Sequence, residues 1–264
     1  MKGLLSAGAD FRRAGRPWIR HRLSPMSRIR PKVFVIVPAA GSGERLGGQV
    51  KKQFLLLREK PIIVHTLQRF EHCSDVDEIA IAVPEQSIAE MESLVSHYRL
   101  HKVSLVTVGG VHRQDSVANV LRKFVFRPSD IVLVHDGVRP FVEPKRISQV
   151  IRACKEHDAA VLGVQPKDTI RRSRGGEFFE ETLDRNALWQ VQTPQAFKAS
   201  LLVKAFKNAK RHRMYATDEA ALVERVGVNA KIVEGSYDNI KITTQEDLEL
   251  GRLILERWRT KGLL

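Results

Sequence analysis

The glycine-rich stretch after the first predicted strand has residue types that can bind phosphate. An apolar, β-branched run at 33–37 predicts a buried strand, and Gly41, Gly43, Arg45 and Lys52 follow it. Small residues after a strand leave backbone N–H groups pointing outward, where they can bind an anion. Fixed positive charges complete such a site. We therefore expect this stretch to hold a nucleoside triphosphate at the carboxyl end of the strand.

The stretch matches neither of the two best-known phosphate motifs. The chain has no G-x-x-x-x-G-K-[ST] string, and the dinucleotide fingerprint fails because Leu46 stands where its third glycine is needed. On glycine spacing alone, a tight strand-to-helix turn with a solvated basic helix start is an equally good interpretation. The motifs further along the chain have to decide between the two.

A second glycine pair opens the segment GGVHRQDSV at 109–117. Asp115 or Ser116 is predicted to cap the helix that follows, and a capped turn is the simpler interpretation. The functional interpretation is that the backbone of Gly110 and the hydroxyl of Ser116 contact a base, while Arg113 braces the loop.

The fourth predicted strand ends in HDGVRPF at 135–141. A carboxylate such as Asp136, at the carboxyl edge of a sheet, is well placed to hold a sugar hydroxyl or a metal-bound phosphate. Arg139 could instead form a structural ion pair with it. We favour a functional role because Asp136 should share the sheet edge with the first glycine-rich stretch.

Three features lie in the second half of the chain. Two β-prone runs in 168–192 flank a Gly-Gly pair and predict a projecting hairpin, which would be marginal alone and should pack on a partner chain. Lys241 is predicted inside a short apolar strand, where its ammonium must reach an edge or a ligand. Thr217 is predicted to cap a helix, and TLDRNALWQVQTPQAF at 182–197 to form the end of the arm and a turn.

Strand and helix patterns alternate through most of the body. The strands are predicted at 33–37, 78–83, 102–108, 130–135, 159–164 and 230–234. The helices are predicted at 61–72, 85–99, 115–124, 144–156, 199–211, 217–226 and 244–259. This order predicts a three-layer, mostly parallel, Rossmann-like α/β sheet with its active site at the strand carboxyl ends.

Composition excludes several classes of protein. At 264 residues, 43% hydrophobic and 28% charged, the chain can bury one large core. No apolar run approaches the roughly 18 residues that a bilayer crossing needs, so no membrane partner is expected. Cys73 and Cys154 are the only cysteines, which predicts no disulfide framework and fits a reducing compartment.

The net charge of +14 is unevenly distributed. The first 32 residues hold nine Lys and Arg against Asp10 alone, so they account for +8 of the total. Residues 1–30 are predicted to be a disordered basic extension, and 31–264 the folded domain. The extension resembles a transit peptide or a nucleic-acid-binding arm, but we favour an upstream extension with Met26 as the true start. A nucleic-acid partner is not expected, because the charge is concentrated in the extension.

Taken together, the strings VPAAGSGERLG, KQF, VHDGVRPF, DRNALWQVQTPQAF, TDEAALVE and DNIKITTQEDL resemble one family over residues 33–259. They occur in the order found in the 2-C-methyl-D-erythritol 4-phosphate cytidylyltransferases. The resemblance implies transfer of CMP from CTP to a phosphorylated polyol with release of pyrophosphate. It also implies Mg²⁺ held mainly by the CTP phosphates rather than by protein ligands, and a cytoplasmic enzyme in bacteria, or a plastid one if 1–30 is a transit peptide.

The resemblance assigns roles to residues of this chain. The catalytic residues would be Arg45, Lys52, Arg185 and Lys241. The nucleotide would contact Ala39, Ala40, Gly41, Gly43, Gly110, Arg113, Ser116 and Asp136. The polyol phosphate would contact Arg139, Thr169 and Thr193.

The family also has a hairpin arm that is exchanged across a homodimer, so Arg185 and Thr169 would serve the neighbouring site. Two positions depart from the usual pattern, with Lys51 in place of proline and Val111 in place of a small or acidic residue. The closest alternative is a cytidylyltransferase for another polyol phosphate, such as ribitol 5-phosphate.

Overall fold

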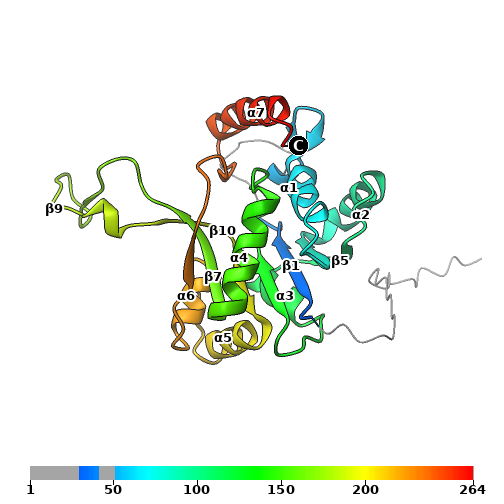
Figure 1. Ribbon diagram of the computed structural model, residues 1–264, viewed down its shortest axis with the longest axis horizontal. Helices are drawn as coiled ribbons and strands as arrows, with labels where there is room; N and C mark the ends of the chain where they lie inside the picture. Colours follow the sequence, from blue (N-terminus) through cyan, green and yellow to red (C-terminus); the bar gives the residue numbers. More distant parts are fainter. Residues whose placement is uncertain (1–29, 42–50, 264) are drawn as a thin grey trace, which may run out of the picture.

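The structure, a computed structural model, describes residues 30–41 and 51–263 (Figure 1). A seven-stranded sheet in the order β11-β7-β10-β6-β1-β4-β5 forms its centre. Its strands are β1 (Val33–Pro38), β4 (Glu78–Val83), β5 (Val103–Val108), β6 (Ile131–Val134), β7 (Ala159–Val164), β10 (Gln190–Lys198) and β11 (Lys231–Glu234). Only β10 runs antiparallel to its neighbours, so the predicted, mostly parallel sheet is confirmed.

Helices cover both faces of the sheet and make the three predicted layers. One face packs on α1 (Ile62–Glu71), α2 (Ile88–His97) and α4 (Pro144–His157). The other packs on α3 (Arg113–Leu121), α5 (Ala199–Arg211) and α6 (Glu219–Glu224). The last helix, α7 (Gln245–Thr260), covers a separate cluster beside the small hairpin of β2 (Leu56–Leu57) and β3 (Lys60–Pro61).

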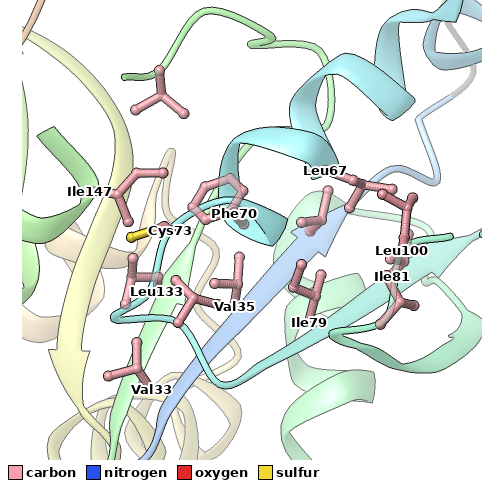
Figure 2. Close-up of a cluster of buried hydrophobic side chains, with 14 of the residues drawn as sticks. Val33, Val35, Leu67, Phe70, Cys73, Ile79, Ile81, Leu100, Leu133 and Ile147 are labelled. Atoms are coloured by element: carbon pink, nitrogen blue, oxygen red, sulfur yellow. The ribbon is translucent and has the colours of Figure 1, made fainter. Parts of the chain in front are cut away.

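The first strand shows why the core has this form. Alternate residues of a strand point to opposite faces, so Val33 and Val35 join one cluster and Phe34 and Ile36 join the other. Figure 2 shows the first pair in the cluster that also contains Phe70 of α1. Because helices cover both faces, the strand is apolar throughout rather than alternating.

The central strand β10 is the main element that the sequence analysis missed. Residues 182–197 were expected to form the end of the arm and a turn, yet β10 pairs with both β6 and β7. Pro194 and the neighbouring glutamines argue against a central strand, because proline cannot donate to a ladder. The register shifts between Val191 and Gln195 on the β7 side, and this irregularity accommodates the proline. Gln195 is buried, and its side chain bonds Asp218 (2.8 Å) and the Ala220 amide (3.1 Å).

Two local predictions were also wrong. Lys241 does not lie in a strand, because the segment around it makes local turn bonds and one backbone bond to another element, from Ile242 to Val138 (2.9 Å), rather than a ladder. The cap of α6 is Asp218, whose carboxylate accepts from the Ala221 amide at 3.0 Å, and not Thr217.

The predicted hairpin projects from the body at the level of β10 and β7 (Figure 1). Its strands, β8 (Arg171–Arg172) and β9 (Glu181–Thr182), contain two residues each. Gly175 has a φ of +74°, which glycine adopts without strain. Residues 190–192, assigned to the arm by prediction, belong to β10 instead.

Within the described residues, no helix is long and apolar enough to cross a bilayer. The thiols of Cys73 and Cys154 are both buried and free. The prediction for 1–30 lies outside the described residues, apart from Arg30.

Candidate active site

A pocket of about 180 Å³ opens at the carboxyl ends of β1, β5 and β6. We call it the central pocket. Its lining includes many of the residues predicted for the site, namely Ala39, Ala40, Gly41, Lys52, Gly110, Arg113, Ser116, Asp136 and Lys241. The sheet brings them together because parallel strands end at one edge, so loops far apart in sequence meet there.

Asp136 is the electrostatic centre of this pocket. Its carboxylate accepts from Arg113 Nε at 2.8 Å and Arg139 Nε at 3.4 Å, and pairs with Lys241 Nζ at 3.0 Å. Burial alone would raise the pKa of Asp136, but the three cations, led by Arg113, hold it far below its usual range. Asp136 is therefore a fixed anion that positions three cations.

Glu219, on α6, is a site residue that the sequence analysis did not single out. Both of its carboxylate oxygens accept from Arg113 Nη1 at 2.8 Å, and it is 1% exposed. Burial opposes the charge of Arg113, but Glu219 and Asp136 together raise the pKa of the guanidinium above its ordinary value. Only its place in TDEAALVE could have indicated Glu219, because its partner lies 106 residues away in the chain.

His135 and Thr193 form a hydrogen-bond chain behind Asp136. The Nε2 atom of His135 lies 3.0 Å from the Arg139 carbonyl, which can only accept, so Nε2 carries the proton. Nδ1 must then accept from the Thr193 hydroxyl at 3.0 Å, and that oxygen accepts from the Asp136 amide at 3.1 Å. The chain fixes the backbone of Asp136 and one tautomer of His135.

Burial also decides the charge of His135. The side chain is fully buried, and desolvation lowers its pKa from 6.5 to about 4. His135 is therefore neutral near pH 7, as the tautomer above requires. It acts through the residues that it positions rather than as an acid or base.

The loop at 109–112 approaches its neighbours too closely for any side chain at its two glycines. A Cβ on Gly109 would lie 2.3 Å from that of Ala40, and one on Gly110 would lie 2.2 Å from that of Asp115. The predicted cap was misplaced, because the N-cap of α3 is His112 rather than Asp115 or Ser116; Asp115 is the third residue of the helix, and its carboxylate accepts from the His112 amide at 3.1 Å in a capping box.

Ser116 takes part in the same loop. Its Oγ accepts from the Gly110 amide at 3.0 Å, so this donor is used inside the loop. A base in the pocket would consequently meet a loop that Ser116 already holds in shape.

Lys51 and Lys52 end the glycine-rich stretch in different directions. Lys52 begins the short 3-10 helix η2 (Lys52–Phe54) and lines the central pocket beside Gly41. Lys51, which stands in place of the usual proline, donates from Nζ to the Ser87 hydroxyl at 3.1 Å. Gln53, not singled out from the sequence, also lines the pocket and donates to the Ala39 carbonyl at 2.8 Å.

The remaining predicted site residues lie outside the pocket lining. Arg139 and Thr193 are behind Asp136, and Arg139 Nη1 also donates to the Asn239 carbonyl at 2.8 Å. Arg185 and Thr169 are exposed on the arm, where Arg185 Nη1 donates to the Lys167 carbonyl at 2.8 Å. The predictions for Gly43 and Arg45 fall outside the described residues, whereas Val111 is one of the lining residues and is 93% exposed.

The donor set of the pocket fits a metal ion carried by a ligand better than one held by the protein. Residues 30–41 and 51–263 contain no group of three His, Cys, Asp or Glu side chains that could hold a metal. Asp136 is the carboxylate among the described lining residues, and cations already occupy both of its oxygens.

Fold and pocket together define a class of protein. A mostly parallel α/β sheet carries a cation-rich pocket on glycine loops at its strand carboxyl ends, as α/β proteins that bind nucleotides do. The model of the family "IspD: 2-C-methyl-D-erythritol 4-phosphate cytidylyltransferase" matches residues 33–257. The chain belongs to this family.

Individual relatives match most of the chain. The 2-C-methyl-D-erythritol 4-phosphate cytidylyltransferase of Lysinibacillus sphaericus is 43% identical, over 84% of this chain and 95% of its own length. That of Syntrophus aciditrophicus is 41% identical, over 87% and 98%. The crystal structure of the Francisella tularensis enzyme of that name superposes with a TM-score of 0.72 at 32% identity, over 84% of this chain and 99% of its own.

Proposed function

We propose that the protein transfers CMP from CTP to 2-C-methyl-D-erythritol 4-phosphate. The products would be 4-diphosphocytidyl-2-C-methyl-D-erythritol and pyrophosphate. The names of the relatives support this reaction, and they do not favour a ribitol 5-phosphate enzyme. The observation that carries the proposal is the central pocket itself, where Arg113 and Lys241 pair with one fixed anion, Asp136, at the edge of the sheet and Lys52 lines the same pocket.

The reaction needs positioning and charge neutralisation more than covalent catalysis. A phosphate oxygen of the polyol attacks the α-phosphorus of CTP, and the bond from that phosphorus to the oxygen bridging to the β-phosphate breaks. The electron pair leaves with pyrophosphate. The nucleophile is already an anion, so no general base is required, in agreement with the neutral, internally bonded His135.

The cations of the pocket have distinct proposed roles. Lys52, with Arg45, would stabilise the charge that develops on the triphosphate. Lys241 would hold the phosphate of the polyol, with its ammonium oriented by Asp136 at 3.0 Å. Arg113 would keep the loop at 109–112 in shape through its bonds to Asp136 and Glu219.

Mg²⁺ is proposed as the accompanying ion, held mainly by the triphosphate oxygens of CTP. When bound, it would neutralise charge on those oxygens. The pocket fits this arrangement because its one described carboxylate, Asp136, is committed to cations.

We also propose a homodimer in which the arm reaches the partner's pocket and brings Arg185 and Thr169 to it. The exposed apolar side chains of the arm support this arrangement, since Phe178 is 80% and Phe179 is 69% exposed. Light scattering at micromolar concentration should report a dimer. A fully active monomer would contradict the proposal.

The relatives named above are bacterial, which supports a bacterial cytoplasmic location over a plastid one. The reaction itself is tested with a substrate panel. Purified protein is given CTP, ATP, UTP or GTP together with methylerythritol phosphate, ribitol 5-phosphate or a sugar phosphate, and pyrophosphate release is measured. Turnover should require CTP and methylerythritol phosphate, and faster turnover with ribitol 5-phosphate would refute the assignment.

A further inference from the structure

A second and larger hollow lies on the opposite side of α3 from the central pocket. It has a volume of about 550 Å³ and is lined by residues of α3 and α5. Both helices cover the same face of the sheet (Figure 1). We call it the basic groove. Its floor is apolar and includes Ala118, Leu121, Val203, Phe206 and Met214. It shares no lining residue with the central pocket.

Around this apolar floor, positive charge outnumbers the one lining carboxylate, Asp115. Arg122, Lys207, Lys210 and Arg213 line the groove and are all exposed. In the described part of the chain, none of the four forms an ion pair with a carboxylate, and Arg122 donates only to the Asn119 amide oxygen. The sequence from 185 to 217 contains no Asp or Glu, so α5 has no acidic residue of its own to balance them.

This arrangement is unfavourable without a ligand. Lys207 and Lys210 are three residues apart on one helix, and like charges at this spacing repel each other. An apolar hollow in contact with water is a second cost. A ligand with a hydrocarbon chain and an anionic head would relieve both, because the chain would cover the floor while the head pairs with the rim.

We propose that the basic groove binds a single-chain amphipathic anion, a hydrocarbon chain that ends in a phosphate monoester. A nucleic acid would match the charge but would leave the apolar floor uncovered. The proposal concerns a second site, goes beyond the proposed function, and does not depend on it.

The groove is built on the same helix that supports the central pocket. The Gln114 side chain donates to the Met214 carbonyl and accepts from the Ala216 amide, both at 3.0 Å. The Tyr215 hydroxyl donates to the Asp115 carboxylate at 3.3 Å, and that carboxylate caps the His112 amide. A ligand in the groove would therefore contact the N-terminal end of α3, which begins with Arg113.

Isothermal titration calorimetry tests the site directly and needs no turnover, so its failure is distinct from a failure of the proposed function. The full chain is titrated with decyl phosphate, hexyl phosphate and inorganic phosphate, and both alkyl phosphates are kept below their critical micelle concentrations. A buried methylene contributes up to about fourfold in affinity. Decyl phosphate should therefore bind at least about tenfold more tightly than hexyl phosphate, and inorganic phosphate more weakly than both.

A charge-reversed pair locates the site. Lys207→Glu with Lys210→Glu should weaken decyl phosphate binding by about tenfold or more, because two attractive charges become repulsive. The matched control is Arg152→Glu with Lys155→Glu, two exposed cations at the same spacing on α4, which covers the other face of the sheet. The control should bind decyl phosphate as the unmodified chain does. If circular dichroism shows that the Lys207→Glu, Lys210→Glu double variant is unfolded, the Lys207→Gln, Lys210→Gln double variant replaces it.

Several results would overturn the proposal. Equal affinity for decyltrimethylammonium would show that the anionic head does not contribute to binding. Equal affinity for decyl phosphate and hexyl phosphate would show that the apolar floor does not contribute. Equal losses in both double variants would assign the binding to net charge alone. Displacement of decyl phosphate by a single-stranded RNA oligonucleotide of higher affinity would assign this face to nucleic acid.

Discussion

We call the ion-paired residues Arg113, Asp136 and Glu219 the wall of the central pocket. The wall and the projecting arm both contain ion pairs at 2.8 Å, yet these pairs differ in burial. In the wall, Asp136 is 6% exposed and Glu219 is 1% exposed, and both bond Arg113. In the arm, the side chains of Arg172 and Glu181 pair at the same distance but remain about half exposed. The same chemistry therefore has a different strength in the two regions, because water screens the charges of the arm more than those of the wall.

The two regions differ in whether a single chain supplies all the contacts that hold their charged side chains in place. The wall is organised within a single chain, where Asp136 meets Arg113 and Lys241 and Arg113 meets Glu219, all from distant elements. The arm consists of two-residue strands, and its Arg185 bonds only to a nearby backbone carbonyl among the described residues. A residue held this loosely can position a substrate only when something packs against it, which agrees with the proposed dimer.

The largest effect is expected from removing a cation of the central pocket. Lys52→Ala should lower kcat by about 10²–10³, because it deletes a charge that stabilises the transition state, and Arg45→Ala should do the same. The melting temperature should be unchanged. Lys51→Ala is the control, since its ammonium bonds Ser87 instead of lining the pocket, and near-normal turnover in Lys52→Ala would refute the assignment.

Asp136→Asn tests whether the wall is a buried charge network. Removing one member of a buried network leaves cations uncompensated, so the free energy of unfolding should fall by about 3–5 kcal/mol. Glu181→Gln on the arm breaks an exposed pair and should cost at most about 1 kcal/mol. Urea denaturation measures both, and equal losses would abolish the distinction between the two regions.

Acidification should weaken the wall through His135. Desolvation lowers the pKa of this imidazole from 6.5 to about 4 in the folded protein, so between these values the unfolded chain binds more protons. Stability is therefore complete above pH 6.5 and falls as the pH drops toward 4, by about 3 kcal/mol in total. His65 has the same shift for the same cause and adds a similar loss, while the pKa of Asp136 lies below this window.

His135→Gln separates the two histidines. Urea denaturation between pH 7 and pH 4.5 should show roughly half of the loss that the two histidines cause in the unmodified protein, because of the two only His65 remains. His65→Gln should have an equal effect. An unchanged slope in His135→Gln would mean that His135 is not held neutral by the wall.

The smallest effect is expected on the arm. Arg185→Lys keeps the charge but loses the planar, two-pronged contact with phosphate. KM for methylerythritol phosphate should therefore rise by about tenfold, and more than KM for CTP. Arg174→Lys, at the tip of the same arm, is the control and should change neither value. A rise in KM for CTP alone would show that Arg185 contacts CTP and not the polyol phosphate.

Much of this molecule could be predicted from local patterns in the sequence. The strands β1, β4 and β7 have the predicted bounds to within one residue, because a strand covered on both faces is apolar throughout and ends where polar or small residues begin. The glycines at 109 and 110 and the carboxylate at 136 were correctly placed at the sheet edge. For these residues, chemistry and position in the chain are enough, since the carboxyl ends of parallel strands converge.

Tertiary structure decided the rest. β10 looks unlike a central strand, and tertiary contacts stabilise it: it pairs with β6 and β7, and Gln195 bonds Asp218 and Ala220. Glu219 became a site residue because folding brings it to Arg113 across 106 positions. Sequence periodicity reports how each residue is buried, but the partner of a buried charge depends on which elements the fold places side by side.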